Sequence, residues 1–188
     1  MYDSKVSAMN VIEDVINEAD IALEIPVTTY LRWLNELEQN LYGAIVRGQK
    51  RETVTGANGE IPVNCDPADI ISIYHEGDFI AKTTPELLPL MANSNFYAIN
   101  GTKVESLYGD VEYDVYCIER PEIKTEQNYD TETVKLPVEF LELAYCKLRG
   151  EAYKLANEDG LAAKWLADYN ARLADFAAWH EQRKGYGE

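Results

Sequence analysis

The side chains that could perform chemistry in this 188-residue sequence are few and scattered. Asp110, Glu112 and Asp114 have the alternate spacing of the first ligands in a calcium-binding loop. However, Val115 stands where such a loop requires glycine, and the closing glutamate is missing. Alternation along a β-strand produces the same spacing. We therefore interpret these residues as part of a strand, and we predict no metal site and no bound cofactor.

The cysteines and histidines also lack a catalytic or metal-binding pattern. Cys65, Cys117 and Cys146 are odd in number and far apart, which fits neither a disulfide framework nor a zinc site and favours buried free thiols. His75 and His180 have no partner at ligand spacing, so we expect both on the surface. No serine lies in a nucleophile-elbow motif. The sequence therefore predicts no catalytic residue and a protein that is not an enzyme.

The last third of the chain predicts two long helices that pack on each other. Apolar residues recur there at steps of three and four, the spacing of one helix face. They are Leu141, Tyr145, Leu148, Ala152 and Leu155 in the first helix, and Leu161, Trp165, Tyr169, Leu173 and Phe176 in the second. Because the polar link at 157–160 is short, the two stripes should face each other as an antiparallel hairpin.

The first fifty residues predict two further helices. Ser4 is a candidate cap for the first, whose apolar stripe covers 6–19. Thr28 or Thr29 is the candidate cap for the second, whose stripe covers 30–45. With the C-terminal pair, these segments suggest a body of about four helices.

Between these helical regions the hydrophobic period changes to two, which is typical of β-strands. The expected hairpins pair 52–55 with 60–63, 70–74 with 79–81, and 96–99 with 102–105. Two of their turns contain Asn-Gly, a sequence that tolerates positive φ. A further strand is expected at 111–118, where apolar and acidic residues alternate.

These elements predict an α+β fold: a helical bundle of about four helices with an inserted β-rich lobe of hairpins. We expect the bundle to comprise 1–50 and 134–180 and the lobe to comprise 51–133. A C-terminal tail at 181–188 should follow, since it is too polar and glycine-rich to bury itself.

The formal net charge of −16 argues against sequence-independent binding of nucleic acid, because such binding requires clustered Lys and Arg. Most of the excess lies in 51–130, where 15 acidic side chains stand against 5 basic ones. These acidic side chains either form a solvated surface or face a polyanion that must move past them without binding. No segment has the length or apolar character of a membrane helix or a signal peptide, so we expect no membrane partner and synthesis in a cytoplasm.

The thirteen tyrosines are the best indication of a binding surface. Those in the β-rich region exceed what one face of a small sheet can bury, and tyrosine suits protein interfaces where one edge stays wet. We select Tyr97, Tyr108 and Tyr113 as candidate interface residues.

The order of these elements resembles that of the head-to-tail adaptor, or connector, proteins of tailed bacteriophages. Three stretches carry the likeness, with a tyrosine-rich β insertion containing Tyr97-Ala98-Ile99-Asn100-Gly101 between the second and third. They are VIEDVINEA at 11–19, LNELEQNLY at 34–42, and the region from LPVEF at 136–140 to KLRGEAY at 147–153.

This resemblance implies a structural virion protein located in the neck, made in the host cytoplasm before assembly. Such proteins form a ring of about twelve copies under the portal and join the head to the tail. Partners implied are further copies of the chain, the portal protein, and downstream tail or neck proteins. DNA would pass through an acidic channel without specific binding.

In these families a C-terminal extension reaches into the portal. The matching segment here is 180–188, and Arg183, Lys184 and Tyr186 are the candidate portal contacts. Two alternatives remain open: another neck or tail-completion protein, or a cytoplasmic enzyme whose site is assembled only by the fold.

Overall fold

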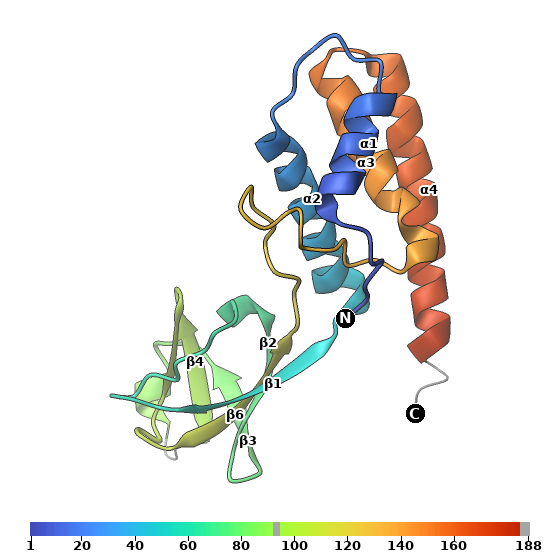
Figure 1. Cartoon of the computed structure of the whole chain (residues 1–188). Helices are drawn as coiled ribbons and strands as arrows, with labels where there is room; N and C mark the ends of the chain where they lie inside the picture. The colour runs from blue at the N-terminus through green and yellow to red at the C-terminus, as the bar shows by residue number, and fades with distance from the viewer. Residues whose placement is uncertain (92–94, 185–188) are drawn as a thin grey trace. The chain divides into compact units, whose positions relative to one another are not determined.

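Within residues 1–91 and 95–184, which the computed structural model describes, the chain forms four α-helices and a curled sheet of six strands (Figure 1). Two compact units result. Residues 1–46 and 120–188 make up a helical unit, and residues 47–119 make up a β unit. In the described residues, no helix has the length and hydrophobicity needed to cross a bilayer. The fold is therefore mixed, with the β unit inserted into the sequence of the helical one.

The helical unit contains α1 (Ala8–Glu18), α2 (Val27–Leu41), α3 (Glu142–Leu155) and α4 (Asp159–Lys184). Each helix contributes to one hydrophobic core, because its apolar stripe lies on a single face. Representative buried side chains are Val11, Ile12, Leu34, Leu37, Leu148, Ala152 and Phe176. The helices expected from periodicity are thus present in all four places.

The helix starts differ from the sequence expectation. The hydroxyl of Ser7, not of Ser4, caps α1 by accepting the amide of Asn10 at 3.2 Å. Ser4 lies three residues before this cap, and its amide donates to the carbonyl of Val134 at 3.1 Å. Neither Thr28 nor Thr29 caps α2, because both lie inside its first turn after Pro26. The turn Tyr42–Val46 continues α2 with π-helical bonding.

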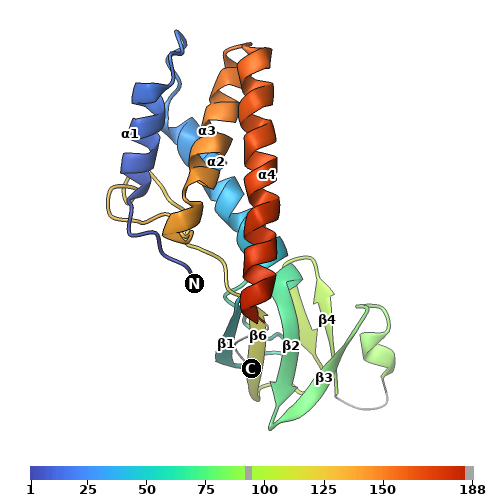
Figure 2. The same cartoon turned by 90° about the vertical axis from the view of Figure 1, so that its right-hand side faces the viewer.

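The predicted antiparallel pair of helices at the C-terminus is confirmed. Figures 1 and 2 show α3 and α4 side by side, joined by three residues in which Asn157 has a φ of 60°. The two helices approach closely at Gly150, where an added Cβ would lie 2.7 Å from Cδ2 of Leu166. The helix α4 continues to Lys184, so residues 181–184 of the expected tail are helical.

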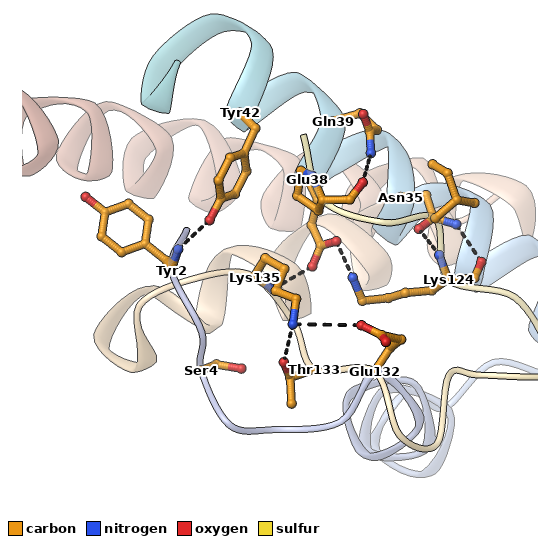
Figure 3. A network of polar contacts seen from close by, with 12 residues as sticks. Tyr2, Ser4, Asn35, Glu38, Gln39, Tyr42, Lys124, Glu132, Thr133 and Lys135 are labelled. Atoms are coloured by element: carbon orange, nitrogen blue, oxygen red, sulfur yellow. Dashed lines mark hydrogen bonds and ion pairs between the residues drawn. The ribbon is translucent and has the colours of Figure 1, made fainter. Parts of the chain in front are cut away.

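Side chains of α2 hold the segment that leads from the β unit back to α3 (Figure 3). The side-chain amide of Asn35 donates to the carbonyl of Lys124 at 2.8 Å and accepts from the backbone amide of Lys124 at 2.9 Å. One turn later, Gln39 donates to the carbonyl of Pro121 at 2.7 Å. The segment is therefore attached to the second half of α2.

The centre of this attachment is an ion pair between Glu38 of α2 and Lys124, both of which are fully buried. The second carboxylate oxygen of Glu38 accepts the amide of Lys135 at 2.7 Å. Burial raises the pKa of Glu38, and the attraction of Lys124 opposes that shift. Each charge is tolerated only because the other is present.

The β unit contains β1 (Gln49–Thr55), β2 (Ile70–His75), β3 (Asp78–Thr83), β4 (Phe96–Asn100), β5 (Lys103–Ser106) and β6 (Glu112–Ile118), in the order β1-β6-β2-β3-β4-β5. The predicted hairpins β2–β3 and β4–β5 are confirmed, with positive φ at Glu76, Gly77 and Gly101. The predicted pairing of 52–55 with 60–63 is wrong, since β1 pairs along its whole length with β6.

The turn at Asn58-Gly59 does form, with φ values of 55° and 79°, but only one bridge, Ala57 to Glu60, follows it. The chain then crosses to β5: Ile61 donates to the carbonyl of Val104 at 2.8 Å, and Ser106 donates to that of Gly59 at 2.9 Å. This crossing makes the sheet curl. The inner face then buries a core of Ile61, Ile73, Ile80, Tyr97, Val104, Tyr113 and Val115.

We expect Glu38→Ala to lower the free energy of unfolding by about 3–5 kcal/mol, because it leaves Lys124 buried without a counter-charge. Glu36→Ala, on the exposed face of the same helix, should change it by less than about 0.5 kcal/mol. Urea denaturation followed by circular dichroism measures both. Equal effects of the two substitutions would contradict the assigned role of the pair.

Gly150→Ala should destabilise the protein by about 1–2 kcal/mol, because the new methyl group forces α3 and α4 apart at Leu166. The matched control is Gly160→Ala in α4, where the added methyl group would contact none of the described residues within 4 Å apart from its chain neighbours and the backbone of its own helix. That substitution should stabilise by about 0.5–1 kcal/mol through helix propensity. Thermal unfolding of the two variants should therefore shift in opposite directions.

Candidate functional site

The carboxylates that resemble calcium ligands have other partners. Asp114 lies on β6 and accepts a two-pronged hydrogen bond from Arg51 of β1, with Nη2 to Oδ2 at 2.8 Å. This bond, with a second from Thr53, lowers the pKa of Asp114. Asp110 precedes the strand and accepts the amide of Asn58 at 2.7 Å. Among the described residues, no three acidic, histidine or cysteine side chains gather in a group that could hold a metal ion.

The three thiols are free. Cys117 and Cys146 are buried as predicted, whereas Cys65 is half-buried. Burial raises the pKa of Cys65 to about 12, with a further contribution from the thiol of Cys117, and it also raises the pKa of Cys146. The thiols of Cys65 and Cys146 are therefore protonated at neutral pH, and in this form they are weak nucleophiles.

The expectation of two surface histidines is wrong for His180, which is 7% exposed. Its Nδ1 lies 2.8 Å from the hydroxyl of Tyr2, and its ring stacks on Phe176. The reason is that the N-terminal segment packs on the last turns of α4, which local sequence spacing does not reveal. His75 is half-buried, and its Nδ1 donates to the carbonyl of Glu112 at 2.8 Å.

The candidate portal contacts lie at the end of α4. Arg183 is exposed, and its guanidinium lies 4.3 Å from the centroid of the Trp179 ring, where the cation and the ring attract each other. Lys184 is the last helical residue. Tyr186 lies outside the described residues. The structure thus places Arg183 and Lys184 in the last turn of α4, directly after His180, which contacts Tyr2 and Phe176.

Two of the three candidate interface tyrosines are core residues. Tyr97 is 3% exposed and Tyr113 is 1% exposed, and both belong to the inner face of the sheet. Tyr108 is half-buried, with its hydroxyl bonded to Asn95 and its ring centroid 4.6 Å from that of His75. We expected one face of a small sheet to bury fewer tyrosines, but the curled sheet encloses its inner side chains and buries more aromatic area.

The outer face of the same sheet carries an aromatic cluster that the sequence argument did not select. Tyr74 of β2 packs edge-on against Phe79 of β3 and Tyr116 of β6, with ring centroids 5.8 Å and 5.6 Å apart. Phe79 is 55% exposed. Beside the cluster, the Arg51–Asp114 pair borders a hollow of about 410 Å³. Exposed aromatic rings next to an arginine are the composition of protein-binding surfaces.

A signal for this cluster existed in the sequence. Tyr74 and Phe79 flank the turn at Glu76-Gly77, so a hairpin there places them opposite each other on one face. Tyr116 joins them only through the pairing of β6 with β2, in register with Ser72. That pairing spans more than forty residues of sequence, and local patterns do not specify it.

The helical unit has a groove of its own. It measures about 620 Å³ and lies between α2 and the segment 123–127, with largely apolar walls. Ile123 lies at its rim with 54% of its surface exposed. Taken together, the outer aromatic cluster and this groove are surfaces suited to protein contact.

Comparison with known families gives one match. A family model described as SU10 adaptor protein matches residues 7–187, which span both units. No curated protein matches the chain.

The correction of the interface residues can be tested by alanine substitution. Tyr97→Ala and Tyr113→Ala should each lower the free energy of unfolding by about 3–5 kcal/mol, because each empties part of the sheet core. Phe79→Ala on the outer face should lower it by less than about 1 kcal/mol. Chemical denaturation distinguishes these cases, and a stable Tyr113→Ala protein would contradict the placement of this ring in the core.

Proposed function

The chain belongs to the SU10 adaptor protein family, a family of phage structural proteins, and on this premise we propose that it is a head-to-tail adaptor of a tailed bacteriophage. In this role about twelve copies form a ring under the portal in the neck and join the filled head to the tail. The observation that carries the proposal is the family match over residues 7–187, which includes the helices and the β unit alike.

The helical unit supports a role as the body of the ring. Its four helices share a core, and in this proposal they act as the bundle. Along the described part of α4, only Ala162, Phe176 and His180 are buried in the single chain. A long helix with most of its surface open gives neighbouring copies an extended area for contact. Leu155 and Leu161, both exposed near the α3–α4 loop, add apolar surface.

The β unit supports contact with the next component of the neck or tail. Its outer aromatic cluster of Tyr74, Phe79 and Tyr116 combines aromatic contact area with two tyrosine hydroxyl groups that can form hydrogen bonds to a partner. The acidic excess of 51–130 supports passage of DNA without binding, since a negative channel wall repels the phosphate backbone. In this proposal these carboxylates face the channel.

The C-terminal contact with the portal is tested best by a variant that keeps the helix end intact. Removal of 180–188 would also remove His180, which bonds Tyr2 and packs on Phe176. We instead delete 185–188 and introduce Arg183→Ala and Lys184→Ala. Mixed with the portal protein of its virion, the unaltered chain should form rings on portal particles in negative-stain images, whereas the variant should form few or none.

The matched control carries Lys164→Ala and Arg172→Ala, which remove two exposed cations from the same helix. It should join the portal as the unaltered chain does. Failure of the unaltered chain to join the portal would refute the adaptor function. Normal joining by the truncated variant would refute the role of the C-terminus alone. A higher-resolution image of the same rings would test the channel proposal, which fails if the acidic side chains of 51–130 point outward.

A further inference from the structure

The strand β1 forms one edge of the curled sheet and bonds to β6 through one side only (Figure 2). Two hydrogen bonds that flank β1 show which of its residues bond to β6 and which point away. The amide of Glu119 donates to the carbonyl of Gly48 at 2.7 Å, and that of Gly56 donates to the carbonyl of Val111 at 2.8 Å. In an antiparallel ladder every second residue bonds to the partner strand. The even-numbered residues of β1 therefore bond to β6, and the odd-numbered ones point away.

The outward residues are Gln49, Arg51, Thr53 and Thr55, and all four are exposed. Among the described residues, their backbone amides and carbonyls have no hydrogen-bond partner. The opposite edge of the sheet differs, because residues 59–61 bond to β5 and cover it. The chain thus closes one edge with its own backbone and leaves a seven-residue edge ready to bond a further strand.

We propose that β1 binds an extended segment of another virion protein, which adds to the sheet as a seventh strand. The identity of the donor as a neck or tail neighbour rests on the proposed adaptor function. The outward amides and carbonyls of β1 would form the ladder bonds, and the side chains beside them would select the segment. The donor carries no proline where it pairs, since proline cannot donate to a ladder.

The charges along β1 define the chemistry of the donor. The β unit holds five Lys and Arg residues between 47 and 119, and three of them are Arg47, Lys50 and Arg51. The side chains of Lys50 and Arg51 are 56% and 57% exposed, even though each pairs with a carboxylate of its own chain. This is a local cationic end on an otherwise acidic unit. The donor segment is therefore acidic where it lies beside 47–51.

A second copy of the chain fits this edge less well. The other edge of its sheet is already covered by 59–61, so only its own β1 is open. Pairing of two β1 strands uses both edges and closes at two copies, which does not build a ring. The ring contacts in the proposed function lie on the helical unit, and they leave β1 available.

Because alternate residues of β1 point away from β6, the substitution Thr53→Pro tests the proposal. The amide of Thr53 points away from β6, so proline there blocks a new strand without removing a bond inside the sheet. The preceding Glu52 is already extended, as a residue before proline must be. Thr53→Ala is the matched control, because it also loses the hydroxyl bond to Asp114 but keeps the amide.

The experiment mixes the full chain with the portal protein and with each recombinant neck or tail protein of its virion, and measures binding and hydrogen exchange. In the unaltered complex, the amides of Arg51 and Thr53 should become protected with one neighbour. Thr53→Pro should still join the portal but should bind that neighbour at least about tenfold more weakly, while Thr53→Ala should bind it normally. Lys50→Glu should also weaken binding, whereas Lys82→Glu on β3 should not.

Each other outcome overturns the proposal. If the amides of Arg51 and Thr53, which point away from β6, remain unprotected in the full neck assembly, no strand is added there, and this measurement needs no variant to fold. Equal binding by Thr53→Pro and the unaltered chain leads to the same conclusion. Protection in the isolated chain at high concentration, together with dimers in sedimentation, would assign the edge to a second copy. Failure of the unaltered chain to join the portal would instead overturn the adaptor function.

Discussion

The buried pair of Glu38 and Lys124 joins the two pieces of sequence, before and after the β unit, that together make up the helical unit. The two residues are 86 positions apart, and both are buried. A lone charge in that position would be very costly, so the return segment must come back to α2 each time the chain folds. Asn35 and Gln39 reinforce this with bonds to the backbone of the same segment. The helical unit can therefore form one core from two separated pieces of sequence.

A second constraint governs the β unit. The crossing of residues 59–61 to β5 curls the sheet, and curling creates an inside and an outside. Tyr97 and Tyr113 are enclosed with the aliphatic residues, whereas Tyr74, Phe79 and Tyr116 remain on the outer face. The same crossing covers β5 and leaves β1 open. Strand alternation assigns each aromatic ring to a face, and the crossing segment helps to enclose the inner face.

These features suit a protein that is completed by its neighbours. The carboxylate of Asp114 is bonded to Arg51 and Thr53, that of Asp110 is bonded to a backbone amide, and the pKa values of the thiols of Cys65 and Cys146 are raised. The surfaces that the two units leave exposed include most of α4, the outer aromatic cluster and the edge of β1. The chain belongs to a family of phage structural adaptors, and in the function proposed above further copies and neighbouring proteins cover these surfaces. Under that proposal, stability of the single chain and assembly with its neighbours use different sets of residues.

The sequence alone determined the elements whose cause is local. Helical spacing identified α1 to α4, because contacts between side chains three or four positions apart are enough to define a helix face. Turn residues with positive φ identified the hairpins β2–β3 and β4–β5, because a two-residue turn is enough to specify a hairpin. The quoted stretches also carried the family resemblance that the match over 7–187 bears out. Only the tertiary structure decided that β1 pairs with β6 and that Lys124 forms an ion pair with Glu38. It also decided that Tyr113 and His180 are buried and that Ser7 caps α1. Each of these depends on which distant segment arrives beside a residue, and burial and pairing across such separations follow from the packing of the whole chain.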